Sequence, residues 1–173
     1  MVNLATRLLL LTLLGLPLFA QSTSVGAFVR GGAFSASSGG GTSGGAQAGV
    51  EACVLCAGRR GLFAEYSHWF SIDRGIGDRV SSADLFAAGL RIQSRRATGI
   101  FFDIGLAGGR DWHSSGRHGG IAGVVGGAGV RIPVAQHWFV RPQVRLYGMS
   151  PHSLEGVELH WIVSAGVGVD YRF

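Results

Sequence analysis

Hydrophobicity along this chain repeats every two residues, and this period constrains the fold more than any other feature of the sequence. From Leu159 to Phe173 every second residue is apolar, and among the residues between them only Ile162 breaks the alternation. Residues 138–146 alternate in the same way, with Arg141 and Arg145 on the polar side. Because side chains of a β-strand point to opposite faces in turn, the pattern predicts strands with one apolar and one polar face.

Turn signals divide these alternating runs into eight predicted strands. The strands are expected near 24–33, 46–54, 60–69, 83–93, 98–108, 120–132, 138–148 and 157–173. The connections between them are alternately long (34–45, 70–82, 109–119 and 149–156) and short (55–59, 94–97 and 133–137). Alternating long loops and short turns are typical of outer-membrane β-barrels, whose long loops are extracellular and whose short turns are periplasmic. An even number of strands then places both ends of the barrel chain in the periplasm.

Composition favours a barrel in a membrane over a soluble one. The 173 residues fit one domain, and 47% of them are hydrophobic while only 14% are charged, against roughly 25% charged in ordinary soluble domains. A soluble β-sandwich or ligand-carrying barrel would need an exterior rich in Lys, Glu and Asp, but the chain has no lysine. Its 15 basic residues are scattered arginines, which argues against nucleic acid as a partner. A soluble periplasmic ligand-binding barrel remains an alternative.

The first twenty residues have the layout of a secretory signal peptide. Arg7 precedes an apolar run from Leu8 to Phe19, and Ala20 supplies a small residue for cleavage. Beyond residue 20 no run approaches the length of a transmembrane helix. We therefore predict a signal peptide at 1–20, a barrel domain at 21–173, and localisation in the outer membrane.

The fold class that these observations predict is all-β: an eight-stranded antiparallel transmembrane β-barrel with a polar, plugged interior. A barrel of this size has a lumen just wide enough for side chains to fill, so the polar faces must meet one another. We expect Arg–carboxylate pairs to plug it, and an ion-conducting channel lined by arginines is the weaker alternative. The predicted lumen charges are Arg30, Glu51, Glu65, Arg91, Asp103, Arg131, Arg141, Arg145, Asp170 and Arg172.

Two residue types complete this prediction. The many glycines, above all at 119–129 and in the last strand, are expected to leave room for large arginines, since small residues opposite large ones fill a narrow lumen. Aromatic residues at strand ends are expected to form girdles at the two membrane interfaces. These residues are Trp69, Trp138, Tyr147, Tyr171 and Phe173.

The end of the chain resembles the last strand of bacterial outer-membrane barrel proteins, with a terminal Phe173, an aromatic Tyr171 two residues earlier and alternating apolar residues before it. Residues 138–147 also resemble the penultimate strand of small OmpA/OmpX-type, opacity and porin-like barrels. The resemblance implies recognition of this final strand by the barrel-assembly machinery. As separate predictions we expect a monomer, contact with outer-membrane lipids, lipopolysaccharide as a candidate partner, and a structural or surface-interaction role through the extracellular loops.

Some outer-membrane barrels are enzymes, and the lipid A 3-O-deacylases use a His-x-Ser pair with a downstream Glu. His113 and Ser115 match the first part of that motif, but the next Glu is Glu155. Both this cluster and a second one are therefore expected to be solvated loop residues, and we predict no enzyme, catalytic residue, metal or cofactor. The first cluster includes Arg110, Asp111, Trp112, Ser114 and His118, and the second includes His152, Ser153, Glu155 and Glu158.

Cys53 and Cys56 form a Cys-x-x-Cys string in the first predicted short turn. Zinc would need two more ligands at suitable spacing, and export favours oxidation, so a short structural disulfide is expected. His68, His137 and His160 are isolated in the sequence and are assigned no ligand role. Four arginines of the predicted outer loops are candidates for lipopolysaccharide phosphates or for plain solvation. They are Arg74, Arg79, Arg110 and Arg117.

Overall fold

The computed structural model describes residues 23–36, 42–56, 58–72, 80–96, 98–116, 118–152 and 159–173, so the predicted signal peptide lies outside the described residues. Eight strands are present, as predicted. They are β1 (Ser24–Ala36), β2 (Ser43–Val54), β3 (Arg60–Ser71), β4 (Val80–Gln93), β5 (Gly99–His113), β6 (His118–Pro133), β7 (Trp138–His152) and β8 (Leu159–Arg172).

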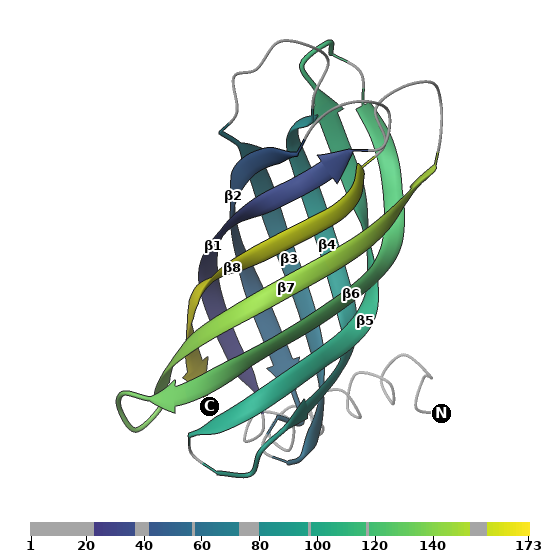
Figure 1. The fold of residues 1–173 in the computed structure, drawn as a ribbon. Coiled ribbons are helices and arrows are strands. Elements are labelled where there is room, and N and C mark those ends of the chain that lie inside the picture. The colour runs from purple at the N-terminus through teal and green to yellow at the C-terminus, as the bar shows by residue number, and fades with distance from the viewer. Residues whose placement is uncertain are drawn as a thin grey trace, which may run out of the picture.

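The strands form one closed antiparallel barrel in which each strand pairs with its neighbour in the sequence and β1 pairs with β8 (Figure 1). The short connections β2–β3, β4–β5 and β6–β7 lie together at one end, which we name the turn end; the opposite end is the loop end. Closure leaves no unpaired sheet edge, which is the condition for strands to cross a bilayer. Among the described residues, no helix is long and apolar enough to cross a membrane.

The strands are longer at the loop end than the sequence pattern predicts. β2 begins at Ser43, β4 at Val80, and β5 continues to His113. The hydrophobic alternation fades in these segments because their residues are glycine or polar. Backbone pairing continues there all the same, for example Asp84 with Arg110 and Trp112 with His118.

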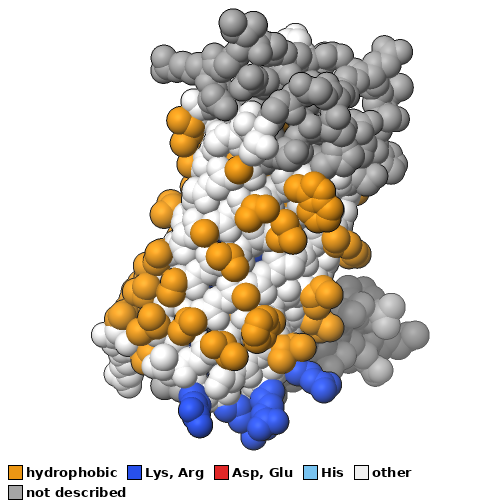
Figure 2. Space-filling view, viewed as in Figure 1, with side chains coloured by type: hydrophobic (Ala, Val, Ile, Leu, Met, Phe, Trp, Pro, Cys, Tyr) orange, Lys and Arg blue, Asp and Glu red, His pale blue; other side chains and the backbone are white. Residues whose placement is uncertain are grey.

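The outer wall of the barrel is apolar, and Figure 2 shows hydrophobic side chains distributed over one face of it. On β8, Val163, Val167 and Val169 are exposed, while Ser164 and Asp170 on the same strand are buried. On β7, Val144 and Leu146 are exposed, while Arg141 and Arg145 are only 1% exposed. The barrel is therefore inverted relative to a soluble protein, as the period of two predicted.

Candidate functional site in the filled lumen

Eight charged side chains fill the part of the lumen nearer the turn end, and we name them the polar layer. All eight were predicted to face inward, and all are buried. Their formal charges balance, four arginines against four carboxylates. The polar layer consists of Arg30, Arg91, Arg141, Arg145, Glu51, Glu65, Asp103 and Asp170.

Glu51 and Arg145 form the centre of the polar layer. The Glu51 carboxylate contacts Arg91 Nη2 at 2.8 Å and Arg145 Nη2 at 2.9 Å, and it also pairs with Arg141. Arg145 in turn contacts Glu65 at 3.2 Å and Asp103 at 2.7 Å. Each of these two groups bridges three partners of opposite charge, and their contacts alone join five of the eight strands: β2, β3, β4, β5 and β7.

Bidentate pairs hold the outer parts of the polar layer. Arg30 donates to both oxygens of Glu65, at 3.0 and 2.7 Å. Arg91 donates to both oxygens of Asp103, at 2.8 and 2.7 Å. Paired N–H···O bonds of this kind fix the relative orientation of guanidinium and carboxylate, so the lumen charges are held in one arrangement.

Aromatic rings and glycines complete the packing around the arginines. The Arg30 guanidinium lies 3.7 Å from the centroid of Phe28, and that of Arg91 lies 4.4 Å from the centroid of Phe101. A Cβ atom on Gly127 would come within 2.6 Å of Arg145 Nη1. The prediction that missing side chains leave room for arginines is confirmed at this position.

The part of the lumen nearer the loop end is filled mainly by apolar side chains, which the sequence prediction of a polar interior did not include. We name these buried side chains the apolar layer. On β3, β4 and β8 they lie on the loop side of the charged residues of the same strand: Trp69 beyond Glu65, Leu85 before Arg91, and Ile162 before Asp170. The apolar layer consists of Trp69, Val80, Ala83, Leu85, Ala87, Ala107, Ile121, Val125, Met149 and Ile162.

Tyr147 joins the two layers. Its ring belongs to the buried apolar cluster, while its hydroxyl donates to Glu65 and accepts from Arg30 at 3.1 Å. Gln47 donates to the same hydroxyl at 3.3 Å and to Ser67 at 2.7 Å. The lumen is therefore filled across the boundary between its charged and apolar parts.

The prediction of aromatic girdles is wrong for Trp69 and Tyr147. Both side chains point into the lumen, since each lies an even number of residues from an inward-facing charge on its own strand, Glu65 and Arg145 respectively. At the turn end the outward prediction is confirmed. Trp138 and Phe173 are exposed there, and the Tyr171 ring contacts both, with centroids 5.1 and 5.2 Å apart.

Arg131 and Arg172 were predicted to belong to the buried network, but both are only half-buried. Arg131 donates a long hydrogen bond of 3.4 Å to Gln93 and lies over the Phe139 ring. These two residues lie near the turn ends of β6 and β8, where the lumen opens toward solvent. Both residues add positive charge at this opening of the lumen.

The His-x-Ser string was predicted to lie in a loop, and its histidine instead lies in β5. His113 Nε2 is 3.1 Å from Asp111 Oδ2, and both side chains are over nine-tenths buried. Asp111 also accepts a hydrogen bond from the Gly119 backbone at 2.9 Å. Ser115 lies in the exposed turn that follows, and His113 Nδ1 has no hydrogen-bond partner among the described residues.

A polar cluster on the outer wall escaped the sequence analysis. His68 Nδ1 lies 2.7 Å from Asp84 Oδ1, and the Tyr66 hydroxyl donates to the same oxygen at 2.9 Å. The rings of Phe70 and Phe86 flank it. His68 is therefore not isolated; the signal that was missed is the cross-strand register, which places His68 opposite Asp84.

The remaining predicted positions lie partly within and partly outside the described residues. Cys53 and Cys56 form the expected disulfide. Arg110 is exposed on β5, and His137 Nδ1 is 3.0 Å from the Arg172 carbonyl oxygen. No group of His, Cys, Asp and Glu able to hold a metal occurs within the described ranges. Positions outside the described residues, or whose side chains are not described, are Arg74, Arg79, Arg117, His152, Ser153, Glu155, Glu158 and His160.

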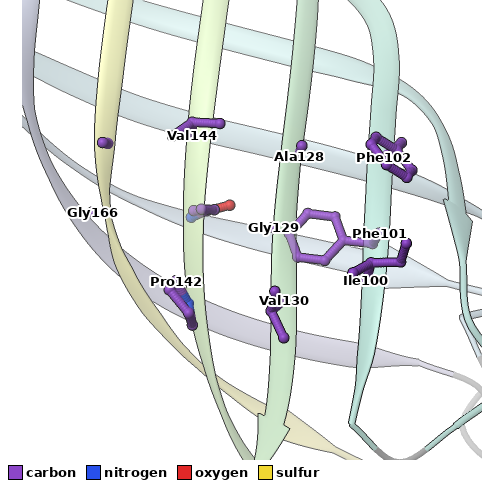
Figure 3. Close-up of a pocket in the computed structure, with 11 residues that line it drawn as sticks. Ile100, Phe101, Phe102, Ala128, Gly129, Val130, Pro142, Val144 and Gly166 are labelled. Atoms are coloured by element: carbon purple, nitrogen blue, oxygen red, sulfur yellow. The ribbon is translucent and has the colours of Figure 1, made fainter.

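A shallow apolar groove of about 530 Å³ crosses the outer face of β5 to β8 (Figure 3). Small residues line it, among them Ala128 and Gly129 on β6 and Gly166 on β8. Pairing between β6 and β7 is interrupted at Val130 and Arg131, opposite Pro142 and Arg141, and the proline has no N–H to donate to a strand pair. The groove therefore lies where the side chains of the wall are small and where the pairing of β6 with β7 is interrupted.

No protein-family model and no curated protein matches this sequence. Solved structures do match its fold. Neisserial surface protein A aligns with a TM-score of 0.70 at 13% identity, covering 87% of this chain and 97% of that one. The N-terminal barrel of Pseudomonas aeruginosa OprF gives 0.58 at 14% identity, with 88% and 99% covered. Ail of Yersinia pestis gives 0.57 at 12% identity, with 88% and 99% covered. The chain thus has the fold of the small eight-stranded outer-membrane β-barrels of OmpA/OmpX type.

Proposed function

We propose that this chain is an integral outer-membrane protein that spans the membrane as a filled barrel and acts through its loop end, in a structural or surface-interaction role. The observation that carries the proposal is the inverted distribution of side chains. Large apolar residues cover the wall, including Phe86, Phe102 and Leu106 at 54–72% exposure, while the polar layer is buried. Such a wall is stable only in contact with lipid.

A wide pore does not fit the contents of the lumen. The polar layer occupies one part and the apolar layer the other, and the side chains of Arg141, Arg145, Trp69 and Ile162 are no more than 1% exposed. Barrels that conduct by diffusion need about 16–18 strands. We therefore propose no steady conductance for the resting protein.

Cell fractionation and extraction test the proposed location. We expect the protein in the outer-membrane fraction, resistant to carbonate and urea washes and extracted by detergent. On a detergent gel the unheated protein should migrate differently from the boiled protein, as folded barrels do. Release of folded protein by washing without detergent would instead support the soluble periplasmic barrel.

We further propose that the barrel is not an enzyme. The Asp111–His113 pair is the feature closest to a catalytic group, and a lipid A deacylase is the alternative that it would serve. Purified protein should leave lipid A intact in a detergent assay monitored by mass spectrometry. Release of acyl chains that is abolished by H113A, with heat-modifiable folding retained, would establish the enzyme instead.

Two partners follow from the proposed location. The final strand ending in Tyr171 and Phe173 supports delivery by the barrel-assembly machinery, and the loop end supports contact with lipopolysaccharide. Ail has been crystallised with the heparin analogue sucrose octasulfate, so a barrel of this fold can receive a polyanion. We expect R110Q to weaken binding of purified lipopolysaccharide. Unchanged binding would remove Arg110 from this role.

A further inference from the structure

We propose that the turn end of the barrel, together with the groove on β5 to β8, binds an anionic phospholipid. Four arginines of the turn-end connections would hold the phosphate, and the groove would hold an acyl chain. We name these four residues the basic rim; they are Arg59, Arg60, Arg95 and Arg96. The proposal rests on the membrane location proposed above.

The exposed charged side chains described at the turn end are all positive. All four arginines of the basic rim are exposed, and Figure 2 shows arginine side chains gathered below the apolar wall with no acidic side chain among them in this view. The acids of the described part of the chain nearest this end are buried and already paired: Asp170 contacts Arg141 at 3.2 Å. Half-buried Arg131 and Arg172 add two more positive charges. The surface therefore attracts anions.

The position of the basic rim matches the headgroup level of a bilayer. Arg95 and Arg96 lie between Ile92 and Ile100, which are 55% and 56% exposed and are the last apolar wall residues of β4 and β5. Arginines directly beyond a lipid-facing apolar band lie at phosphate depth, where they attract anionic lipid headgroups. A soluble anion would gain nothing from this placement relative to the apolar wall.

The groove begins where the basic rim ends. Ile100 lies four residues after Arg96 and forms one wall of the groove, which Phe102 continues toward the loop end (Figure 3). Across the groove, Pro142 and Val144 form the opposite wall. An acyl chain is an extended apolar rod that fits a furrow between two rows of side chains, whereas a neighbouring protein would need a flatter and wider surface. Phosphate contact and chain contact are thus available to one lipid molecule.

Native mass spectrometry of the folded, detergent-solubilised barrel tests the proposal. The protein is offered an equimolar mixture of phosphatidylglycerol and phosphatidylethanolamine with identical chains, and the bound lipids are counted. We expect phosphatidylglycerol to be preferred about tenfold or more, and R95Q/R96Q to remove most of this preference, since each basic residue near a lipid surface contributes about a factor of five. A128L should weaken the binding of both lipids by filling the groove.

A matched variant separates the site from general effects. A88L adds the same bulk as A128L elsewhere on the outer wall, where Ala88 is exposed, and it should leave the binding of both phospholipids unchanged. Equal binding of the two lipids by the unmodified protein, or an unchanged preference in R95Q/R96Q, would overturn the proposal. Full competition by soluble glycerol phosphate would overturn the lipid assignment, and no effect of A128L would overturn the groove. Failure of heat-modifiable folding in the unmodified protein would count against the membrane location itself.

Discussion

Different interactions fill the two layers of the lumen: ion pairs fill the polar layer, and apolar packing fills the apolar layer. In the polar layer, four guanidinium groups and four carboxylates neutralise one another, and the positions of their atoms are fixed by directional bonds such as those of Arg91 to Asp103. In the apolar layer, Leu85, Val125 and Ile162 fill space without directional contacts. The first layer therefore depends on the charge of every member, while the second depends on volume alone.

The lumen is therefore blocked at two levels, once by the polar layer and once by the apolar layer. Water entering the polar layer would still meet the apolar layer, and ions passing the apolar layer would meet fixed charges of both signs. Substitutions in the two layers should consequently differ in kind: loss of a charge strands its partners, and loss of a methyl group leaves a void. Four predictions test this contrast, each measured as the free energy of unfolding by urea in lipid vesicles.

The largest effect is expected from removal of the central carboxylate. E51Q keeps the shape of the side chain but leaves Arg91, Arg141 and Arg145 without their shared partner, at a cost of about 4 kcal/mol. The double variant E51Q/R141Q restores neutrality and should recover part of the loss. A double variant destabilised by the sum of the two single changes would mean that the layer does not act as a network.

The second largest effect concerns volume in the apolar layer. L85A should cost about 3 kcal/mol, because the buried side chain leaves a cavity that no solvent fills. Leu90 on the same strand is 54% exposed on the outer wall, and L90A serves as the control. Lipid can occupy the space left outside, so L90A should cost clearly less. Equal losses would contradict the assignment of Leu85 to a sealed interior.

The contact between the layers gives the third effect. Y147F removes a hydroxyl that bonds Glu65, Arg30 and Gln47, and should cost about 2 kcal/mol, since bonds to charged groups exceed neutral ones. Y66F removes an outward-facing hydroxyl that donates only to Asp84 and should cost less. An unchanged free energy of unfolding in Y147F would show that contact between the two layers does not contribute to stability.

The smallest effect comes from a single methylene group. I162V should cost about 1 kcal/mol, and I104V about nothing, because Ile104 is 66% exposed on the wall. An I162V variant with unchanged stability would mean that β8 is shifted by one residue in register, with its two faces exchanged.

The wall of the barrel could be predicted from the sequence because it depends on one property, the period of two. The strand ends at the loop end could not be predicted, because the glycine and polar residues there show no hydrophobic alternation. In these segments the neighbouring strand imposes the pairing. The layering of the lumen left a trace: Ile162 is the break in the alternation of β8, and it marks the apolar layer.

Contacts across strands were the least predictable part of the site. The partners of Arg145 lie on β2, β3 and β5, and the stagger between strands decides which charges meet. The same holds for His68 and Asp84 on the outer wall. Trp69 and Tyr147 were assigned outward by residue type, although the parity of their positions relative to Glu65 and Arg145 places them inside.

Pairing of β1 with β8 has a consequence for how the molecule forms. Ser24 lies opposite Arg172, and the Phe173 N–H donates to the Thr23 carbonyl at 3.1 Å, so this seam unites the stretches of the barrel farthest apart in sequence. The seven other strand pairs can form between neighbours in the chain, but the seam cannot form until β8 has been made. Before β1 pairs with β8, the sheet has two unpaired edges and the charged side chains of the polar layer are still exposed on one side. Ring closure and burial of the polar layer should therefore be a single late event in folding.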